Sequence, residues 1–109
     1  MNQKLLYGSI PMLILSVLRN KDMYGYEIIQ TLEVRAENHF SLKEGTLYPL
    51  LHKMESNKHI KSYTESSGGR KRKYYKITNT GMKELASSKE EWETYTNFVS
   101  GVIKYEKVL

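Results

Sequence analysis

Apolar residues recur at helical spacing near the N-terminus of the chain. They follow the i, i+3, i+4, i+7, i+8 pattern of a helix that buries one face: Ile10, Leu13, Ile14, Val17 and Leu18. Pro11 suits the first turn of such a helix, where the backbone needs no N–H from that residue. The polar residues 20–22 then predict a turn after Arg19.

Two further helices are expected in the first half of the chain. The second covers about residues 24–37, and its inward positions are Ile28, Ile29 and Leu32. The third is expected to start at a capping box formed by Ser41 and Glu44, in which each side chain bonds an unpaired backbone N–H. It is expected to end near Asn57.

The third predicted helix carries apolar and polar residues on opposite faces. Its inward positions are Leu47, Leu50, Leu51 and Met54. The positions on or beside its open face are Lys43, Thr46, Tyr48 and Lys53. Pro49 is anomalous, because an interior proline removes a backbone hydrogen bond at a cost of about 3 kcal/mol. Either the helix is distorted near Gly45 or it begins later than the capping box suggests.

The pattern then changes to short segments rich in β-branched and aromatic residues. Residues 60–64 and 73–77 flank the polar stretch 65–72, which predicts a β-hairpin with a flexible tip at residues 66–69. A long helix without proline is expected over residues 79–105. The order of elements predicts a mainly α fold with a small β-hairpin.

Charge separates the body of the chain from its C-terminal part. The 109 residues have a formal net charge of +5 and no cysteine, so neither disulfides nor thiolate metal sites are expected. Residues 1–83 carry 14 basic and 7 acidic side chains, whereas residues 84–109 carry 3 and 5. A basic body suits contact with a polyanion, although ordinary surface charge is an alternative.

The apolar N-terminal run lacks the features of a targeting or membrane segment. It is interrupted by Gly8, Ser9, Pro11 and Ser16. We therefore expect neither a signal peptide nor a membrane span, and we place the protein in the cytoplasm.

The returning limb of the hairpin is strongly basic. Five of the seven residues from Arg70 to Lys76 are Lys or Arg, and such a limb can neutralise phosphates. A basic exposed β-edge can also simply discourage aggregation. The two helices before it have the form of a helix-turn-helix, so the combination favours nucleic-acid binding.

Several segments together resemble the PadR-like family of transcriptional regulators. They occur in the family's order and spacing: Met23–Ile28, Glu44–Leu51, Gly68–Thr78 and Gly81. The resemblance covers nearly the whole chain, and the single C-terminal helix is similar to the compact subfamily. It implies a winged helix-turn-helix DNA-binding domain over residues 1–78 and a C-terminal dimerisation helix over residues 79–109.

The resemblance also implies which side chains contact DNA. It places the recognition helix at about residues 43–57, and the expected contacts are Tyr24, Lys43, Thr46, Tyr48, Arg70, Lys71, Arg72 and Lys73. Tyr24 and Tyr26 are candidate phosphate contacts through their hydroxyls, although Tyr26 could equally brace the third helix. The four hairpin residues would contact the DNA backbone or minor groove.

The last predicted helix has more apolar surface than its own domain needs. Its apolar residues spread beyond one narrow face: Met82, Leu85, Trp92, Tyr95, Phe98, Val99, Val102 and Ile103. Part of that surface is expected to bind a second chain, unless it packs on the first helix. The expected homodimer interface is Leu85, Trp92, Tyr95, Val99, Val102 and Ile103.

Trp92, the only tryptophan, is expected where the last helix approaches its symmetry mate. It can be an interface anchor. Alternatively, it and its mate flank a cavity for a planar aromatic or cationic effector, with Glu91 or Glu93 as counter-charge. The resemblance supports the second hypothesis, because multidrug-sensing members of the family bind planar compounds between paired tryptophans.

No catalytic constellation is apparent in the sequence. His39, His52 and His59 lack further ligands at suitable spacing, so we expect no metal, no cofactor and no enzyme activity. The leading hypothesis is a homodimeric, sequence-specific repressor that binds a palindromic double-stranded DNA operator and is released by an effector. Repression is implied by the resemblance. The alternatives are an RNA-binding or ribosome-associated basic module and a protein-interaction adaptor.

Overall fold

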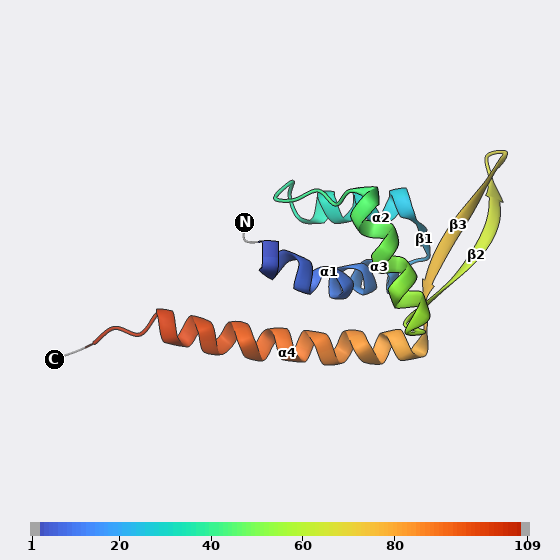
Figure 1. Ribbon diagram of the computed structural model, residues 1–109. Coiled ribbons are helices and arrows are strands. Elements are labelled where there is room, and N and C mark those ends of the chain that lie inside the picture. The colour runs from blue at the N-terminus through green and yellow to red at the C-terminus, as the bar shows by residue number, and fades with distance from the viewer. Residues whose placement is uncertain (1–2, 108–109) are drawn as a thin grey trace.

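Between residues 3 and 107 the chain forms four helices and a small three-stranded sheet (Figure 1). A computed structural model describes the backbone of residues 3–107 and the side chains within that range, except those of residues 3–7 and 67. The elements in chain order are α1 (Gln3–Leu18), β1 (Met23–Tyr24), α2 (Gly25–Arg35), α3 (Glu44–Ser56), β2 (Ile60–Ser67), β3 (Arg70–Ile77) and α4 (Asn79–Ile103).

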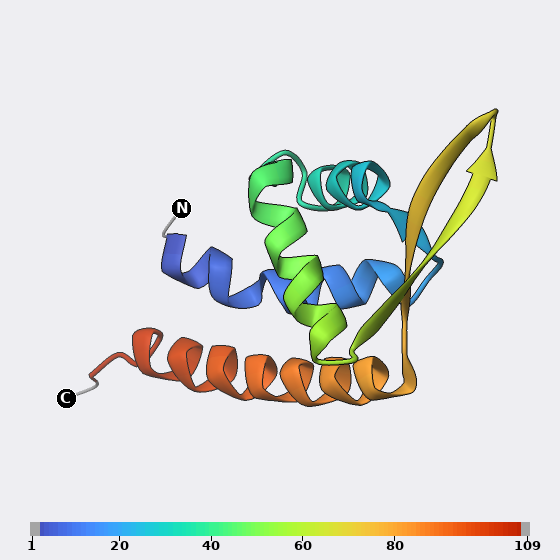
Figure 2. The ribbon, with the colours of Figure 1, turned by 45° about the vertical axis from the view of Figure 1, so that its right-hand side comes forward.

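Helices α1, α2 and α3 form a body around one apolar core, with α3 crossing α1 (Figure 2). The core includes Ile10, Ile14, Ile28, Leu47, Ile60 and Leu85, each at most 2% exposed. Full burial of one such side chain contributes about 1.5–3 kcal/mol. Among the described residues no polar or charged side chain is buried, so the charges lie at the surface, where a ligand can reach them.

Helix α1 begins earlier than the apolar pattern predicts. It starts at Gln3, so Pro11 lies in the helix interior, and its predicted place in the first turn is wrong. The proline removes one backbone hydrogen bond from the helix. The apolar spacing nevertheless identified the buried face, because Ile10 and Ile14 are fully buried.

Helix α3 begins at Glu44, with Lys43 at its N-cap, so the capping box predicted at Ser41 is wrong. The Ser41 hydroxyl instead donates to the Glu33 carboxylate of α2 at 2.8 Å. The later start places Pro49 in the second turn of α3. Of the two explanations for this proline, a later start is therefore correct.

The hairpin of β2 and β3, which we call the wing, is longer than predicted. Both strands run eight residues, and most of the polar stretch 65–72 continues them. Gly68 and Gly69 form the two-residue turn, with φ of 58° and 79°. Glycine suits this turn because it adopts positive φ at no steric cost.

A third strand, β1, was not predicted from the sequence. Met23 pairs with Tyr75 and Tyr24 with Tyr74, so the antiparallel sheet has the order β1-β3-β2. A strand of two residues is too short to show alternation of apolar and polar positions. It fixes the base of the wing to the start of α2.

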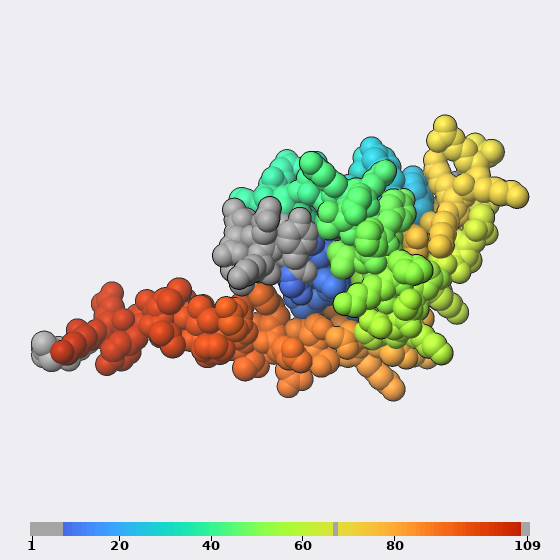
Figure 3. Space-filling view, in the orientation of Figure 1, coloured from blue at the N-terminus to red at the C-terminus, as the bar shows by residue number. Residues whose placement is uncertain are grey.

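Helix α4 closely matches its predicted range. Its N-cap is Thr78, whose hydroxyl accepts from the Gly81 N–H at 2.9 Å and donates to the Lys58 carbonyl at 2.6 Å. The N-terminal part of α4 lies along α1, whereas its C-terminal part projects beyond the body (Figure 3). The molecule is therefore elongated, at 70 × 29 × 21 Å.

Candidate nucleic-acid interface

Helix α3 presents a polar face beside the wing. Leu47, Leu51 and Met54 are buried and hold the helix against the core. The predicted contacts Lys43 and Tyr48 are exposed, and Thr46 is half-buried. All three therefore lie on the open side of α3, as its apolar spacing predicts, and α2 and α3 together form a helix-turn-helix.

Tyr48 lies against the first residue of α2. Its ring carbon Cζ is 2.9 Å from where a Cβ on Gly25 would stand, and its hydroxyl is closer still. Only glycine leaves room for this approach. The contact brings Tyr48 to the N-terminus of α2, where unpaired backbone N–H groups and the positive end of the helix dipole favour an anion such as phosphate.

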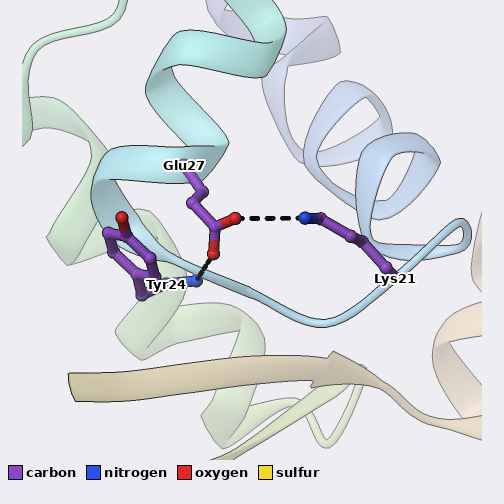
Figure 4. Close-up of polar contacts among 3 residues, drawn as sticks. All are labelled: Lys21, Tyr24 and Glu27. Carbon is purple, nitrogen blue, oxygen red and sulfur yellow. Dashed lines mark hydrogen bonds and ion pairs between the residues drawn. The ribbon is translucent and has the colours of Figure 1, made fainter. Parts of the chain in front are cut away.

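Glu27 orders the start of α2. Its carboxylate accepts a hydrogen bond from the Tyr24 N–H at 3.3 Å and pairs with the Lys21 ammonium at 3.2 Å (Figure 4). This carboxylate performs one half of a capping box. Neither contact is visible from residue spacing, so Glu27 could not be identified from the sequence.

Strand alternation divides the basic wing residues between the two faces of the sheet. Lys71 and Lys73 share a face with Tyr75, and the Lys73 ammonium is 5.6 Å from the centre of the Tyr75 ring. Arg70 and Arg72 lie on the opposite face. The four charges therefore form two pairs and not one cluster.

The face of the wing that carries Lys71 and Lys73 is the one that meets α3, and we call it the helix face. On this helix face of the sheet, the Ser62 hydroxyl donates to the Glu55 carboxylate of α3 at 2.5 Å. Burial raises the pKa of Tyr75, and the nearby Tyr48 and Glu55 raise it further, so its hydroxyl stays neutral. Ser62, Glu55 and Tyr75 thus join the wing to α3.

The opposite face carries a row of aromatic rings, and we call it the tyrosine face. Tyr24 meets Tyr74 edge-on at 5.6 Å, and Tyr74 stacks on Tyr63 at 5.7 Å. The Arg72 guanidinium lies 4.5 Å from the centre of the Tyr24 ring. A guanidinium stacked in this way keeps its in-plane N–H groups available for phosphate. Two predicted DNA contacts, Tyr24 and Arg72, are therefore brought together.

Tyr63 and Tyr74 were not identified as functional candidates from sequence. Their proximity depends on the pairing register of β2 with β3 and of β3 with β1, which residue spacing along one strand does not reveal. Tyr26, by contrast, is 53% exposed and its hydroxyl accepts from the Gln30 amide at 3.0 Å. It lies at the surface.

The histidines lie apart from one another. His39 and His52 are exposed, whereas His59 is half-buried and its carbonyl accepts from the Thr78 N–H. In the described part of the chain, no three histidine or acidic side chains gather to hold a metal ion. Over the same residues, no helix has the length and apolarity needed to cross a membrane.

The predicted interface residues of α4 do not all lie at the surface. Leu85 is 2% exposed and packs within the core of its own chain. It therefore offers no surface to a partner and does not belong to the interface predicted for α4. Trp92, Tyr95, Val102 and Ile103 are exposed, and Val99 is half-buried. The projecting part of α4 thus carries most of the predicted set.

A helix-turn-helix followed by a basic wing defines a winged-helix DNA-binding protein. Residues 14–87 match the transcriptional regulator PadR-like family, and the chain belongs to this family. The protein is therefore a DNA-binding transcriptional regulator and its family is not one of enzymes. The resemblance noted in the sequence is confirmed.

Two sequence relatives match most of the chain. Protein X of Lysinibacillus sphaericus is 41% identical over 86 residues, which are 78% of this chain and 79% of that protein. The transcriptional regulator YqjI of Escherichia coli is 28% identical over 87 residues, which are 80% of this chain but 41% of that protein. The chain thus spans about two fifths of the length of YqjI.

Solved structures share the whole architecture. A transcriptional regulator from Clostridium thermocellum has a TM-score of 0.88 at 33% identity, covering 95% of this chain and 99% of that one. A PadR family regulator from Clostridium difficile R20291 has a TM-score of 0.76 at 43% identity, covering 87% and 98%. The winged-helix fold with a long last helix, predicted from the sequence, is confirmed.

Proposed function

We propose that the protein is a homodimeric transcriptional repressor that binds a palindromic operator in the cytoplasm. In this proposal residues 1–78 bind DNA and residues 79–109 form the dimer. The observation that carries it is the projecting half of α4, which lies outside the body of its own chain and bears exposed apolar side chains. An exposed apolar helix face of this kind typically marks a protein interface.

The interface would lie along one side of α4. Its exposed apolar residues are Trp92, Tyr95, Phe98, Val102 and Ile103, with exposures between 43% and 74%. Tyr95 packs on Trp92 and meets Phe98 edge-on at 5.4 Å, so these rings form one continuous surface. Burial of large aromatic side chains is the usual energetic centre of an interface.

Each protomer would insert α3 into a major groove. Lys43, Thr46 and Tyr48 would contact DNA from α3, while Lys71 and Lys73 contact flanking phosphates from the helix face of the wing. Phosphates beside the start of α2 would be contacted by Arg70, Arg72 and Tyr24. A two-fold dimer predicts two half-sites about 34–36 Å apart, or a multiple of that spacing.

Selection from a random pool of DNA duplexes tests this function. We expect the protein to enrich an inverted repeat and to bind it more tightly than single-stranded RNA at the same salt concentration. A reporter promoter that contains the repeat should lose transcription when the protein is expressed. A preference for RNA, a site without two-fold symmetry, or increased transcription would contradict the proposal.

We further propose that a planar, cationic aromatic effector binds beside Trp92. A cleft of about 560 Å³ lies between α1 and α4, and its walls include Pro11, Met12, Glu84, Glu91, Trp92 and Tyr95. The aromatic rings suit stacking, and the two carboxylates suit a positive charge. Of the two predicted counter-charges, Glu91 lines this cleft, whereas Glu93 is not among its lining residues.

The intrinsic fluorescence of Trp92 tests the effector site, because the chain has no other tryptophan. A planar cationic dye should quench it, and the dye should also weaken operator binding, since an effector acts only through different affinities for two states. The variant Glu91→Gln should bind the dye less tightly, and Glu93→Gln should not. Quenching that leaves operator affinity unchanged would contradict a regulatory role.

A further inference from the structure

Asp22 connects the turn after α1 to the tyrosine face of the wing. Its carboxylate accepts a hydrogen bond from the Tyr63 hydroxyl at 2.6 Å, across 41 positions of sequence. The Lys76 ammonium lies 4.0 Å from the other carboxylate oxygen. Tyr63 belongs to β2 and Lys76 to β3, so one side chain holds both strands of the wing at their base.

The contact with Tyr63 is a charge-assisted hydrogen bond, the stronger class of such bonds. It raises the pKa of Tyr63 to about 12, so the hydroxyl remains a donor throughout the physiological range. Tyr63 also stacks on Tyr74, which meets Tyr24 at the start of α2. Asp22 therefore closes a chain of contacts that runs from the helix-turn-helix across the whole sheet.

The position of this carboxylate is unfavourable for DNA binding taken alone. Asp22 lies at the base of a basic wing, where a negative charge repels phosphate. It also adds nothing to the apolar core, since it is part-exposed. A structural benefit at this position would offset the electrostatic cost.

The geometry of the wing shows what that benefit is. Each strand has eight residues, and only the two residues of β1 pair with β3 at the base. A strand of this length spans about 26 Å, so a rotation of about 10° at the base moves the tip by roughly 4–5 Å. A shift of that size is larger than a hydrogen-bond length, so the angle at the base decides whether the wing reaches phosphates.

We propose that Asp22 is a positioning residue that sets the angle of the wing relative to α3. It holds Lys71 and Lys73 at the distance from the recognition helix that a flanking DNA segment requires. Asp22 contacts no DNA in this account and acts through Tyr63 and Lys76. The inference rests on the proposed contact between the wing and DNA.

The sign of the effect of Asp22→Ala distinguishes this role from simple electrostatics. Removal of a negative charge near DNA should by itself tighten binding. We expect the opposite: affinity for the duplex that the wild-type protein selects should fall roughly tenfold, the equivalent of one lost charge-assisted hydrogen bond. Fluorescence anisotropy on the full-length protein measures this change.

Two further variants separate the hydrogen bond from the charge. Tyr63→Phe keeps the ring and the net charge but removes the donor, so it should weaken binding in the same direction. Combined with Asp22→Ala, it should add little, because both changes break one contact. Glu65→Gln is the matched control, since it removes a carboxylate from the tyrosine face without breaking a hydrogen bond, and it should leave affinity unchanged or tighten it.

A duplex shortened outside its half-sites reports on the wing directly. The wild type should lose affinity when the flanks are removed. Asp22→Ala and Tyr63→Phe already bind more weakly, and removal of the flanks should reduce their affinity little further. If the variants depend on the flanks as strongly as the wild type, Asp22 does not position the wing. If the wild type itself ignores the flanks, the proposed wing contact fails and this inference fails with it. Circular dichroism checks folding, and Tyr63→Phe alone decides the matter should Asp22→Ala unfold.

Discussion

At the scale of single residues, glycine determines how closely α2 and α3 approach. The Tyr48 ring lies where any side chain at position 25 would stand, so Gly25 sets the position of a predicted DNA contact. Gly81 plays the same part for α4, because its Cα lies against the backbone of His59. These two glycines are required for space and not for an unusual backbone conformation.

The substitution Gly25→Ala should therefore displace Tyr48. Because the atoms that a Cβ would meet belong to the outer end of the Tyr48 side chain, which is 46% exposed, the ring can move aside. We expect weaker operator binding and only a small loss in the free energy of unfolding. Gly45→Ala is the matched control, because no atom lies within 4 Å of a Cβ at that position of α3. Thermal denaturation should show the control unchanged or stabilised by about 0.5–1 kcal/mol. Unchanged operator binding by Gly25→Ala would contradict the role described for the contact between Gly25 and Tyr48.

The lysines on the helix face of the wing should contribute affinity and little specificity. Replacing Lys71 and Lys73 with alanine should reduce the slope of log affinity against log salt by up to about two units per protomer, since each phosphate contact contributes about 0.9. Alanine at Lys89 and Lys107 removes the same charge far from the wing and should change the slope less. An unchanged slope in the wing variant would show that these lysines do not touch DNA.

At the scale of elements, the sequence predicted what periodicity controls. The buried faces of α1 and α3, the existence of the wing and the extent of α4 follow from spacing alone. What could not be predicted depends on pairing across the chain, namely β1 and the contact of Arg72 with Tyr24. The division of Arg70 to Lys73 between two faces was not predicted because residues 65–72 were expected to lie outside the strands. Leu85 was misassigned because its spacing is shared by residues that face the core and residues that face a partner.

Helix α3 should discriminate between sequences. Thr46→Ala should lower the ratio of specific to non-specific affinity, because a lost base contact typically costs about 1–3 kcal/mol on the cognate site. Competition with unrelated duplex DNA measures this ratio. A matched change on the same helix is Ser56→Ala, which lies at the far end of α3 and should leave the ratio unchanged. An equal loss for Thr46→Ala on all sequences would count against α3 as the reader of bases.

At the scale of the whole molecule, the elongated shape and the exposed apolar surface of α4 both support the proposed dimer. The radius of gyration is 16.6 Å, whereas a compact domain of about 100 residues has about 13 Å. The larger radius arises from the projecting half of α4. In a monomer this half would leave its apolar side chains exposed to water. A second α4 packed along it would cover its aromatic and aliphatic residues.

Charges placed in this surface should separate the protomers. Val102→Asp combined with Ile103→Asp introduces two carboxylates at positions that are 70% and 74% exposed in one chain, where only burial by a partner would make them costly. We expect a folded monomer with weakened operator binding. Ser87→Asp, on an exposed and polar part of α4, should remain dimeric. Sedimentation velocity distinguishes the two species.

The most direct measurement of the central claim is the mass of the complex between the protein and its selected duplex. Sedimentation equilibrium should give two chains on one duplex that carries an inverted repeat, and two chains for the free protein at the same concentration. Deletion of residues 90–109 should yield a single chain that has lost tight binding, because one recognition helix then contacts one half-site. A single full-length chain bound to the duplex with undiminished affinity would contradict the account.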